Sequence, residues 1–121
     1  MNLDFLNLQP GETYIGHYGD AEQTTHTILL LGDNDKATFE AALEWAKSIG
    51  GDLPNRIEQA MLWANHRDQF QKEWYWSNET HHAESSWAWY QCFHDGSQGS
   101  YPKHLELRAR AVRRVIVKGK K

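Results

Sequence analysis

The apolar and polar positions of this chain change their period along the sequence, and the first pattern is that of a β-hairpin. Two runs rich in β-branched and aromatic residues, 14–18 and 25–31, flank the turn-forming stretch 19–22. Runs of this kind around a short polar turn predict two paired antiparallel strands. The stretch 32–35 then ends the second strand and offers a helix N-cap.

From residue 36 to residue 49 the apolar positions recur with the 3.6-residue period of a helix. Gly50 and Gly51 follow this segment and supply the left-handed stop that ends a helix. The stripe that we expect to face the core consists of Phe39, Ala42, Leu43, Ala46 and Ile49.

A second helix is predicted from Asn55 onward, because Asn55 and Glu58 have the spacing of a capping box. Its apolar residues again recur with helical spacing, so we expect them to face the core, with Leu62 and Trp63 widening the stripe. The helix should fray near residues 65–68. The stripe itself consists of Ile57, Ala60, Met61 and Ala64.

After the second helix the period changes to two, which is typical of strands. Asp95 and Gly96 end one such strand, and the β-rich segment 108–117 is predicted to form the last strand. The order of a hairpin, two helices and an antiparallel meander predicts a single α+β domain over residues 1–121, with its core at about 12–117 and a short basic C-terminal tail. In the strand before Asp95, one face holds Trp87, Trp89, Gln91 and Phe93, and the other holds Ala88, Tyr90 and Cys92.

Composition indicates the compartment. No apolar run approaches the roughly 18 residues that a membrane span needs, and the acidic N-terminal stretch 2–12 is unlike a signal peptide. Cys92 is the only cysteine, which excludes an internal disulfide and is typical of a reducing compartment. We therefore expect a cytoplasmic protein without a membrane partner.

The charge is unevenly distributed along the chain, whose net charge is −3. Residues 108–121 hold seven of the 13 basic residues and no acid, so the first 107 residues hold six basic against 16 acidic residues. Arg108, Arg110 and Arg114 would share one face of a regular strand, and such a basic ridge could follow the phosphates of a nucleic acid. Because the rest of the surface would repel a polyanion, we expect these arginines to pair instead within the domain, the candidate partners being Glu58, Glu73 and Glu106.

Four blocks in this order resemble a known family: GGDLPNRIEQAMLWAN (50–65), EWYWSNE (73–79), SWAWYQCFHDG (86–96) and ELRARAVRRVI (106–116). The resemblance, which covers about residues 12–117, is to a bacterial and prophage domain family of uncharacterised function that is also found at the C-terminus of a collagen-like bacterial adhesin. It implies a C-type-lectin-like fold with neighbouring termini, two helices and a twisted antiparallel sheet, and it implies a phage or prophage origin. It does not imply sugar binding, because one fold hosts many activities.

The six tryptophans are interpreted mainly as core residues. Two of them, Trp74 and Trp76, would pair across strands with Trp87 and Trp89. We expect Trp76, together with Trp87 or Trp89, to be buried, and one or two of the six to reach the surface. Trp45 and Trp63 are expected to pack from the helices.

Metal-dependent chemistry is disfavoured by the spacing of the candidate ligands. Calcium-dependent sugar recognition needs clustered oxygen ligands, but only Asn78 and Glu79 imitate them and the proline-containing triplet of sugar-binding C-type lectins is absent. Zinc is suggested by His81, His82 and His94, yet neighbouring histidines on an extended chain point to opposite sides. We therefore expect no bound metal.

Catalysis is disfavoured as well. Cys92 lies two positions from His94, but no third residue is tied to this pair and a cysteine within a strand is usually buried and inert. The chain has no Gly-rich phosphate loop and no paired-carboxylate signature. We expect no catalytic residues and no cofactor.

These exclusions leave a binding module whose surface is formed by loops. The segments 77–86 and 94–101 combine polar groups with histidine and tyrosine, which suit protein recognition. The expected partner is a host protein, including one that a phage must neutralise, or a virion protein; the oligomeric state stays open. The alternative is a calcium- or sugar-binding receptor or tail-associated module. The candidate binding residues are Asn78, Glu79, His81, His82, Glu84, His94, Asp95 and Tyr101.

Overall fold

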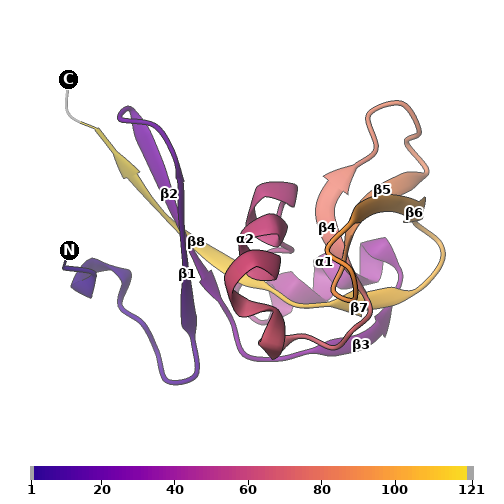
Figure 1. The fold of residues 1–121 in the computed structure, drawn as a ribbon, viewed down its shortest axis with the longest axis horizontal. Coiled ribbons are helices and arrows are strands. Elements are labelled where there is room, and N and C mark those ends of the chain that lie inside the picture. Colours follow the sequence, from indigo (N-terminus) through magenta and orange to yellow (C-terminus); the bar gives the residue numbers. More distant parts are fainter. Residues whose placement is uncertain (1, 120–121) are drawn as a thin grey trace.

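Two sheets and two α-helices make up the fold of the computed structural model, which describes residues 2–119 (Figure 1). The α+β class predicted from the sequence is confirmed. Two short 3₁₀ helices, Asp4–Leu6 and Arg67–Gln69, complete the helical elements of this part of the chain. None of the helices within residues 2–119 is both long and apolar enough to cross a membrane.

The smaller sheet has the strand order β1-β2-β8, and both pairings are antiparallel. Its hairpin consists of β1 (Thr13–Gly19) and β2 (Gln23–Leu29), so the predicted hairpin is confirmed. Strand β8 (Val112–Lys118) returns from the far end of the chain to pair with β2. The two ends of the sequence are thereby brought into one sheet (Figure 1).

The larger sheet has the order β3-β7-β4-β5-β6. Its pairings are antiparallel except for one parallel contact between β4 and β7, so the predicted meander describes only β4, β5 and β6. The strands of this sheet are β3 (Asn34–Ala37), β4 (Trp74–Thr80), β5 (Trp87–Cys92), β6 (Gln98–Pro102) and β7 (Leu107–Ala109).

The single last strand predicted over 108–117 is wrong. The chain leaves the larger sheet after Ala109 and joins the smaller sheet at Val112, so this segment belongs to two strands in different sheets. At the crossing, the N–H of Leu30 donates to the carbonyl of Ala111, which extends the pairing of β2 with β8 by one step beyond Val112. A periodicity argument could not locate this break because the β-rich composition continues through it.

Helix α1 (Phe39–Ser48) begins later than the sequence predicted. Strand β3 takes up the second half of the stretch expected to cap the helix and the two residues that follow it, and the hydroxyl of Thr38 accepts the N–H of Ala41 as the actual cap. Gly50 ends the helix with a positive φ of 88°, as expected. Within the predicted stripe, Phe39, Ala42 and Ala46 are buried, Leu43 is half-buried and Ile49 is exposed.

The two helices lie against different faces of the larger sheet. On the α1 side, Phe39 contacts the fully buried Trp76, whose indole N–H donates to the carbonyl of Ala37 at 2.8 Å. On the other side, α2 (Arg56–His66) lies between the two sheets and covers a second cluster that includes Tyr75 and Phe93 (Figure 1).

The tryptophans divide between core and surface. Trp76 is buried as predicted, and the expectation that one or two of the six reach the surface is confirmed by Trp74 and Trp87, which are 38% and 36% exposed. Trp89, Trp45 and Trp63 are half-buried, so the expectation that Trp87 or Trp89 is buried is wrong. The expected pairing of tryptophans across strands is wrong as well, because Trp74 lies opposite Cys92 and Trp76 opposite Tyr90. Trp74 stacks on Tyr90 with ring centroids 4.2 Å apart.

Candidate functional site

Helix α2 is rotated relative to its sequence prediction. The capping box of Asn55 and Glu58 is present as expected, but the predicted core stripe is wrong. Ile57 is 55% exposed, and Ala60 and Ala64 are exposed as well. The side chains that α2 buries are Glu58, Gln59 and Leu62.

Polar contacts explain this rotation. Glu58 has no exposed surface, and both of its carboxylate oxygens accept hydrogen bonds from Arg114 of β8 at 2.7 Å. It also accepts the hydroxyl of Thr27 at 2.7 Å, and Gln59 donates to the carbonyl of Tyr75 at 3.0 Å. A buried carboxylate is stable only with partners of this kind, so these contacts fix which face of α2 turns inward.

The pKa of Arg114 reflects the same arrangement. Burial by itself would lower this pKa, whereas the hydrogen bonds to Glu58 and Asp52 raise it above its ordinary value. The guanidinium therefore stays charged and serves as the fixed partner of α2.

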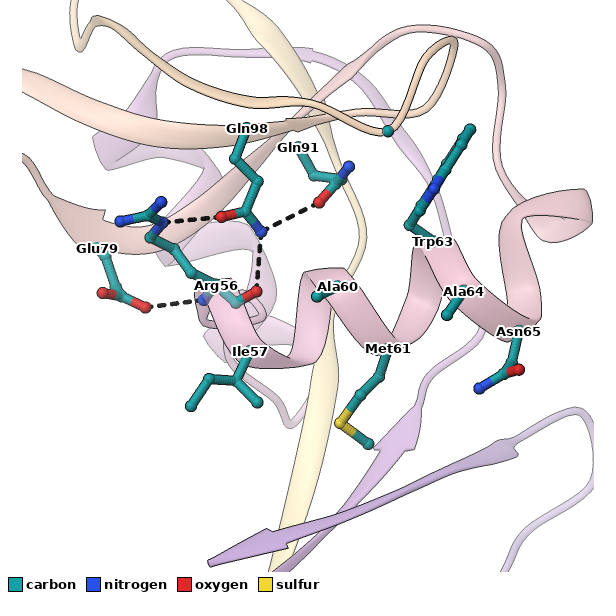
Figure 2. A pocket seen from close by; sticks show the side chains of 11 residues that line it. Arg56, Ile57, Ala60, Met61, Trp63, Ala64, Asn65, Glu79, Gln91 and Gln98 are labelled. Atoms are coloured by element: carbon teal, nitrogen blue, oxygen red, sulfur yellow. Dashed lines mark hydrogen bonds between the residues drawn. The ribbon is translucent and has the colours of Figure 1, made fainter.

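The rotation leaves the apolar stripe of α2 in an open groove of about 770 Å³ (Figure 2). Ala60 and Ala64 lie along the middle of the helix, with Ile57 and Met61 on its hairpin side and Trp63 toward β5 and β6. The small side chains of Ala60 and Ala64 leave the space of the groove open, and the larger apolar side chains border that space. The remaining lining residues are Arg56, Asn65, Glu79, Gln91, Gly96 and Gln98.

A polar network closes one end of the groove (Figure 2). Arg56 Nε donates to Gln98 Oε1 at 2.9 Å, and Gln98 Nε2 donates both to the carbonyl of Arg56 at 2.9 Å and to Gln91 Oε1 at 3.1 Å. The guanidinium of Arg56 lies 3.6 Å from the ring centroid of Trp89. Glu79 accepts the backbone N–H of Arg56 at 2.7 Å, at the N-terminus of α2.

Trp63 forms the other end of the groove. Gly96 lies against its indole so closely that a Cβ atom there would be 2.5 Å from the ring. Beyond Trp63 is a second hollow of about 420 Å³, and the guanidinium of Arg67 lies 4.6 Å from the Trp63 ring centroid. The turn after β5 and the end of α2 thus hold this ring in place.

The predicted loop histidines extend from the Arg56 end of the groove. His81 stacks on Trp89 with ring centroids 5.3 Å apart, and His82 stacks on His81 at 4.8 Å. The expectation that these two histidines point to opposite sides is therefore wrong. His81 Nδ1 accepts the backbone N–H groups of Ala83 and Glu84, both at 3.2 Å, so its ring also orders the loop. The structure therefore brings His81 and Glu79 to the groove end and leaves the Glu84 side chain exposed.

Two predicted site residues have structural roles away from the groove. Asn78 donates to Asp52 Oδ2 at 3.0 Å, and its N–H donates to the carbonyl of Pro54. Tyr101 packs against the α1 side of the larger sheet, where its ring contacts Trp76. The eight candidate residues do not form one surface.

The two candidate residues in the turn after β5, His94 and Asp95, also have different roles. His94 is exposed and lines the hollow beyond Trp63. Asp95 accepts the backbone N–H and the hydroxyl of Ser97, and these hydrogen bonds lower its pKa to about 2. Asp95 therefore stabilises the turn that carries Gly96 rather than lining the groove.

Arg108, Arg110 and Arg114 do not form the basic ridge that the sequence allowed. Arg108 and Arg114 lie on strands of different sheets, and each is paired within the domain. Arg108 contacts Glu73, and Arg114 contacts Glu58, so two of the expected intramolecular pairings are confirmed. The third differs, because Glu106 pairs with Lys36.

Arg110 lies between the two strands with its side chain buried. Its guanidinium donates to the carbonyls of Gln69 at 2.8 Å and Leu30 at 3.0 Å, and burial lowers its pKa. It anchors the crossing between the sheets and cannot follow a phosphate backbone.

Metal ligation and nucleophilic chemistry find no support in the residues that were considered for them. Across positions 2–119, no three side chains of His, Cys, Asp or Glu are placed to hold a metal ion. Cys92 is buried at the end of β5, whereas His94 is exposed.

Sequence reasoning missed Arg56, Trp63 and Gln98 as site residues. The signal for the groove was present in the apolar stripe of α2, but that stripe was assigned to the core.

No protein-family model, no curated protein and no solved structure matches this chain.

Proposed function

We propose that this chain is a non-enzymatic binding module that recognises another protein through the groove along α2. The observation that carries the proposal is the exposed apolar stripe of a helix whose opposite face is fixed by buried polar contacts. Ile57 is 55% exposed, and because full burial of such a side chain is favourable by about 1.5–3 kcal/mol, covering its remaining exposed surface in a complex would contribute about 1–1.5 kcal/mol. A polar rim around an apolar centre is also the usual anatomy of a protein interface.

The partner follows from the sequence resemblance together with this surface. A domain of phage or prophage origin with a C-type-lectin-like fold would act in the cytoplasm of the host cell, on a host protein that it modulates or inhibits, or on a virion protein. The return of β8 to the hairpin sheet supports the fold resemblance, because it brings the two ends of the chain together. The groove supplies the surface and the two sheets hold it rigid.

The test is capture of partner proteins from host and virion lysates by matched variants. Ile57→Gln with Ala64→Gln makes the groove polar without adding charge and keeps good helix formers on α2. Ile116→Gln is the control, since Ile116 on β8 is 53% exposed, close to the 55% of Ile57. We expect the wild type and the control to capture the same proteins and the double variant to lose them. Equal capture by all three would refute the groove as the binding site.

Sugar binding is a second candidate, favoured by the stacked and partly exposed pair of Trp74 and Tyr90. Flat aromatic surfaces of this kind can stack on a sugar ring. Titration calorimetry with calcium and with a glycan panel separates the two functions, because protein recognition through the groove predicts no heat from either. Heat that disappears in Trp74→Ala but persists in the groove variant would establish the sugar-binding function instead.

A further inference from the structure

The six arginines of the chain fall into two groups. Four have guanidinium groups bonded to carboxylates or to backbone carbonyls: Arg108, Arg110, Arg113 and Arg114. Within the described residues 2–119, Arg56 and Arg67 have no carboxylate within ion-pair distance. Arg56 lines the groove and Arg67 lines the hollow beyond Trp63, so these two arginines lie at the two ends of the exposed apolar stripe.

These two arginines lie in line with the stripe. Arg56 is the first residue of α2, and Arg67 directly follows its last residue. Positions 56, 60, 64 and 67 repeat with helical spacing on one face. Eleven residues at 1.5 Å each place the two Cα atoms about 16 Å apart. The order along this face is therefore cation, apolar stripe, cation.

Both guanidinium groups are held by aromatic rings before any partner binds. Arg56 lies 3.6 Å from the centroid of Trp89, and Arg67 lies 4.6 Å from that of Trp63. Gln98 accepts a hydrogen bond only from Nε of Arg56. The two terminal Nη atoms of Arg56 therefore have no hydrogen-bond acceptor in the described part of the chain. A stacked guanidinium presents a fork that fits a carboxylate, and less side-chain entropy is lost when it binds.

The carboxylate of Glu79 lies at the Arg56 end of the groove, but it binds the backbone of Arg56 and not its guanidinium group. It accepts the backbone N–H of Arg56 at 2.7 Å and lies beyond ion-pair distance of the guanidinium. It completes the start of α2 and leaves the fork of Arg56 open.

We infer that the groove takes a protein segment with an apolar centre and an acidic side chain near each end, about 16 Å apart. This spacing corresponds to about three turns of a helix or about five residues of a strand. The apolar centre would cover Ile57, Ala60 and Ala64, and the two carboxylates would meet Arg56 and Arg67. The inference rests on the proposed function and specifies the chemistry of the partner. Nucleic acid fits less well, because two cations on a chain of net charge −3 offer no continuous basic track.

A displayed library of random peptides, about 16 residues long so that they can span three helical turns, tests the inference. The library is selected on the wild type, and the enriched peptides are synthesised and titrated against three single variants, Arg56→Gln, Arg67→Gln and Lys47→Gln. Lys47 is an exposed cation on α1, so Lys47→Gln matches the change in charge. We expect two acidic positions around an apolar centre, binding about tenfold weaker for each arginine variant, and unchanged binding for Lys47→Gln.

Three further measurements complete the test. Thermal unfolding checks that each variant is folded, and Arg56→Lys, which keeps the charge but not the planar fork, should restore only part of the affinity. Salt should weaken binding to the wild type more than binding to the arginine variants. Enriched peptides without acidic positions, or arginine variants that bind as the wild type does, would overturn the inference. Preferential binding of single-stranded DNA, or a dimer of this chain that the groove variant dissociates, would also overturn it.

The outcome separates this inference from the proposed function. If the Ile57→Gln and Ala64→Gln double variant binds the enriched peptides as well as the wild type does, the groove is not the binding site and both fail. If that double variant loses the peptides while the arginine variants keep them, the proposed function stands and only the acidic partner is refuted. A library that yields no peptide for the wild type refutes both.

Discussion

Glu58 of α2 and Arg114 of β8 form a two-pronged ion pair, with both N–O distances at 2.7 Å, and Glu58 is completely buried. The same carboxylate closes the capping box by accepting the N–H of Asn55 at 2.8 Å. One side chain thus starts the helix, sets its rotation and ties it to the smaller sheet. The exposure of the groove depends on this contact.

Replacing Glu58 with Ala should destabilise the fold strongly. The change leaves the guanidinium of Arg114 without its main partner, and breaking a buried pair in this way costs about 3–5 kcal/mol. Glu44→Ala is the control, because Glu44 is exposed on α1 and its loss should change the free energy of unfolding by less than about 0.5 kcal/mol. Urea denaturation measures both, and a loss below about 1 kcal/mol for Glu58→Ala would contradict the anchoring role.

Gly96→Ala should disturb the end of the groove. Gly96 has a φ of 86°, and an added Cβ would lie 2.5 Å from the indole of Trp63. Gly50→Ala is a matched control, since Gly50 has a φ of 88° but open space around it. Both variants carry the strain of a left-handed residue, about 1–2 kcal/mol. Gly96→Ala should cost about 1–3 kcal/mol more and shift the indole N–H resonance of Trp63. Equal losses with an unmoved resonance would show that this contact does not position Trp63.

Trp76 and Trp87 should respond differently to the same substitution. Trp76→Phe removes the donor to the carbonyl of Ala37 in a fully buried site, and an unsatisfied buried group costs about 1–3 kcal/mol before the cavity is counted. Trp87→Phe, at a position 36% exposed, should change the free energy of unfolding by about 0.5 kcal/mol or less. Chemical denaturation of the two variants compares them directly, and similar losses would refute the division between core and surface tryptophans.

The stability of the protein should fall as the pH is lowered from about 7.5 to about 5 because of His26. Burial, and then the neighbouring charge of His17, lower the folded-state pKa of His26 below 6.5. The unfolded chain therefore takes up the proton first, so the contribution of His26 is complete above the unfolded pKa of about 6.5 and is lost as the pH falls through the folded pKa. The hydroxyl of Tyr14 lies 2.9 Å from His26 Nδ1 and supports the neutral ring.

His26→Gln tests this origin of the pH dependence. It keeps a side chain that can hydrogen-bond to Tyr14 but cannot titrate, so the slope of the unfolding free energy against pH should become shallower. His104→Gln, at an exposed turn position, should leave the slope unchanged. An unchanged slope in His26→Gln would assign the pH dependence to other groups.

The sequence predicted those parts of the fold whose causes are local. The hairpin of β1 and β2, the capping box at Asn55 and the left-handed Gly50 follow from neighbouring residues, and each is present. The break between Ala109 and Val112 was missed because each half pairs with a strand distant in sequence. The site was only partly predicted for the same reason. Glu79 and His81 do lie at the groove end, but Asn78 and Tyr101 are held elsewhere by contacts that no spacing rule contains.

The sequence by itself determined that α2 is an amphipathic helix with a stripe at Ile57, Ala60, Met61 and Ala64. Only the tertiary structure decided which way that stripe faces. Periodicity gives the positions of apolar residues around a helix axis but not the partners beyond it. Arg114, 56 residues away along the chain, takes the carboxylate of Glu58 into the interior. Because a buried charge cannot be left unpaired, that contact outweighs the apolar stripe and turns the stripe to the surface.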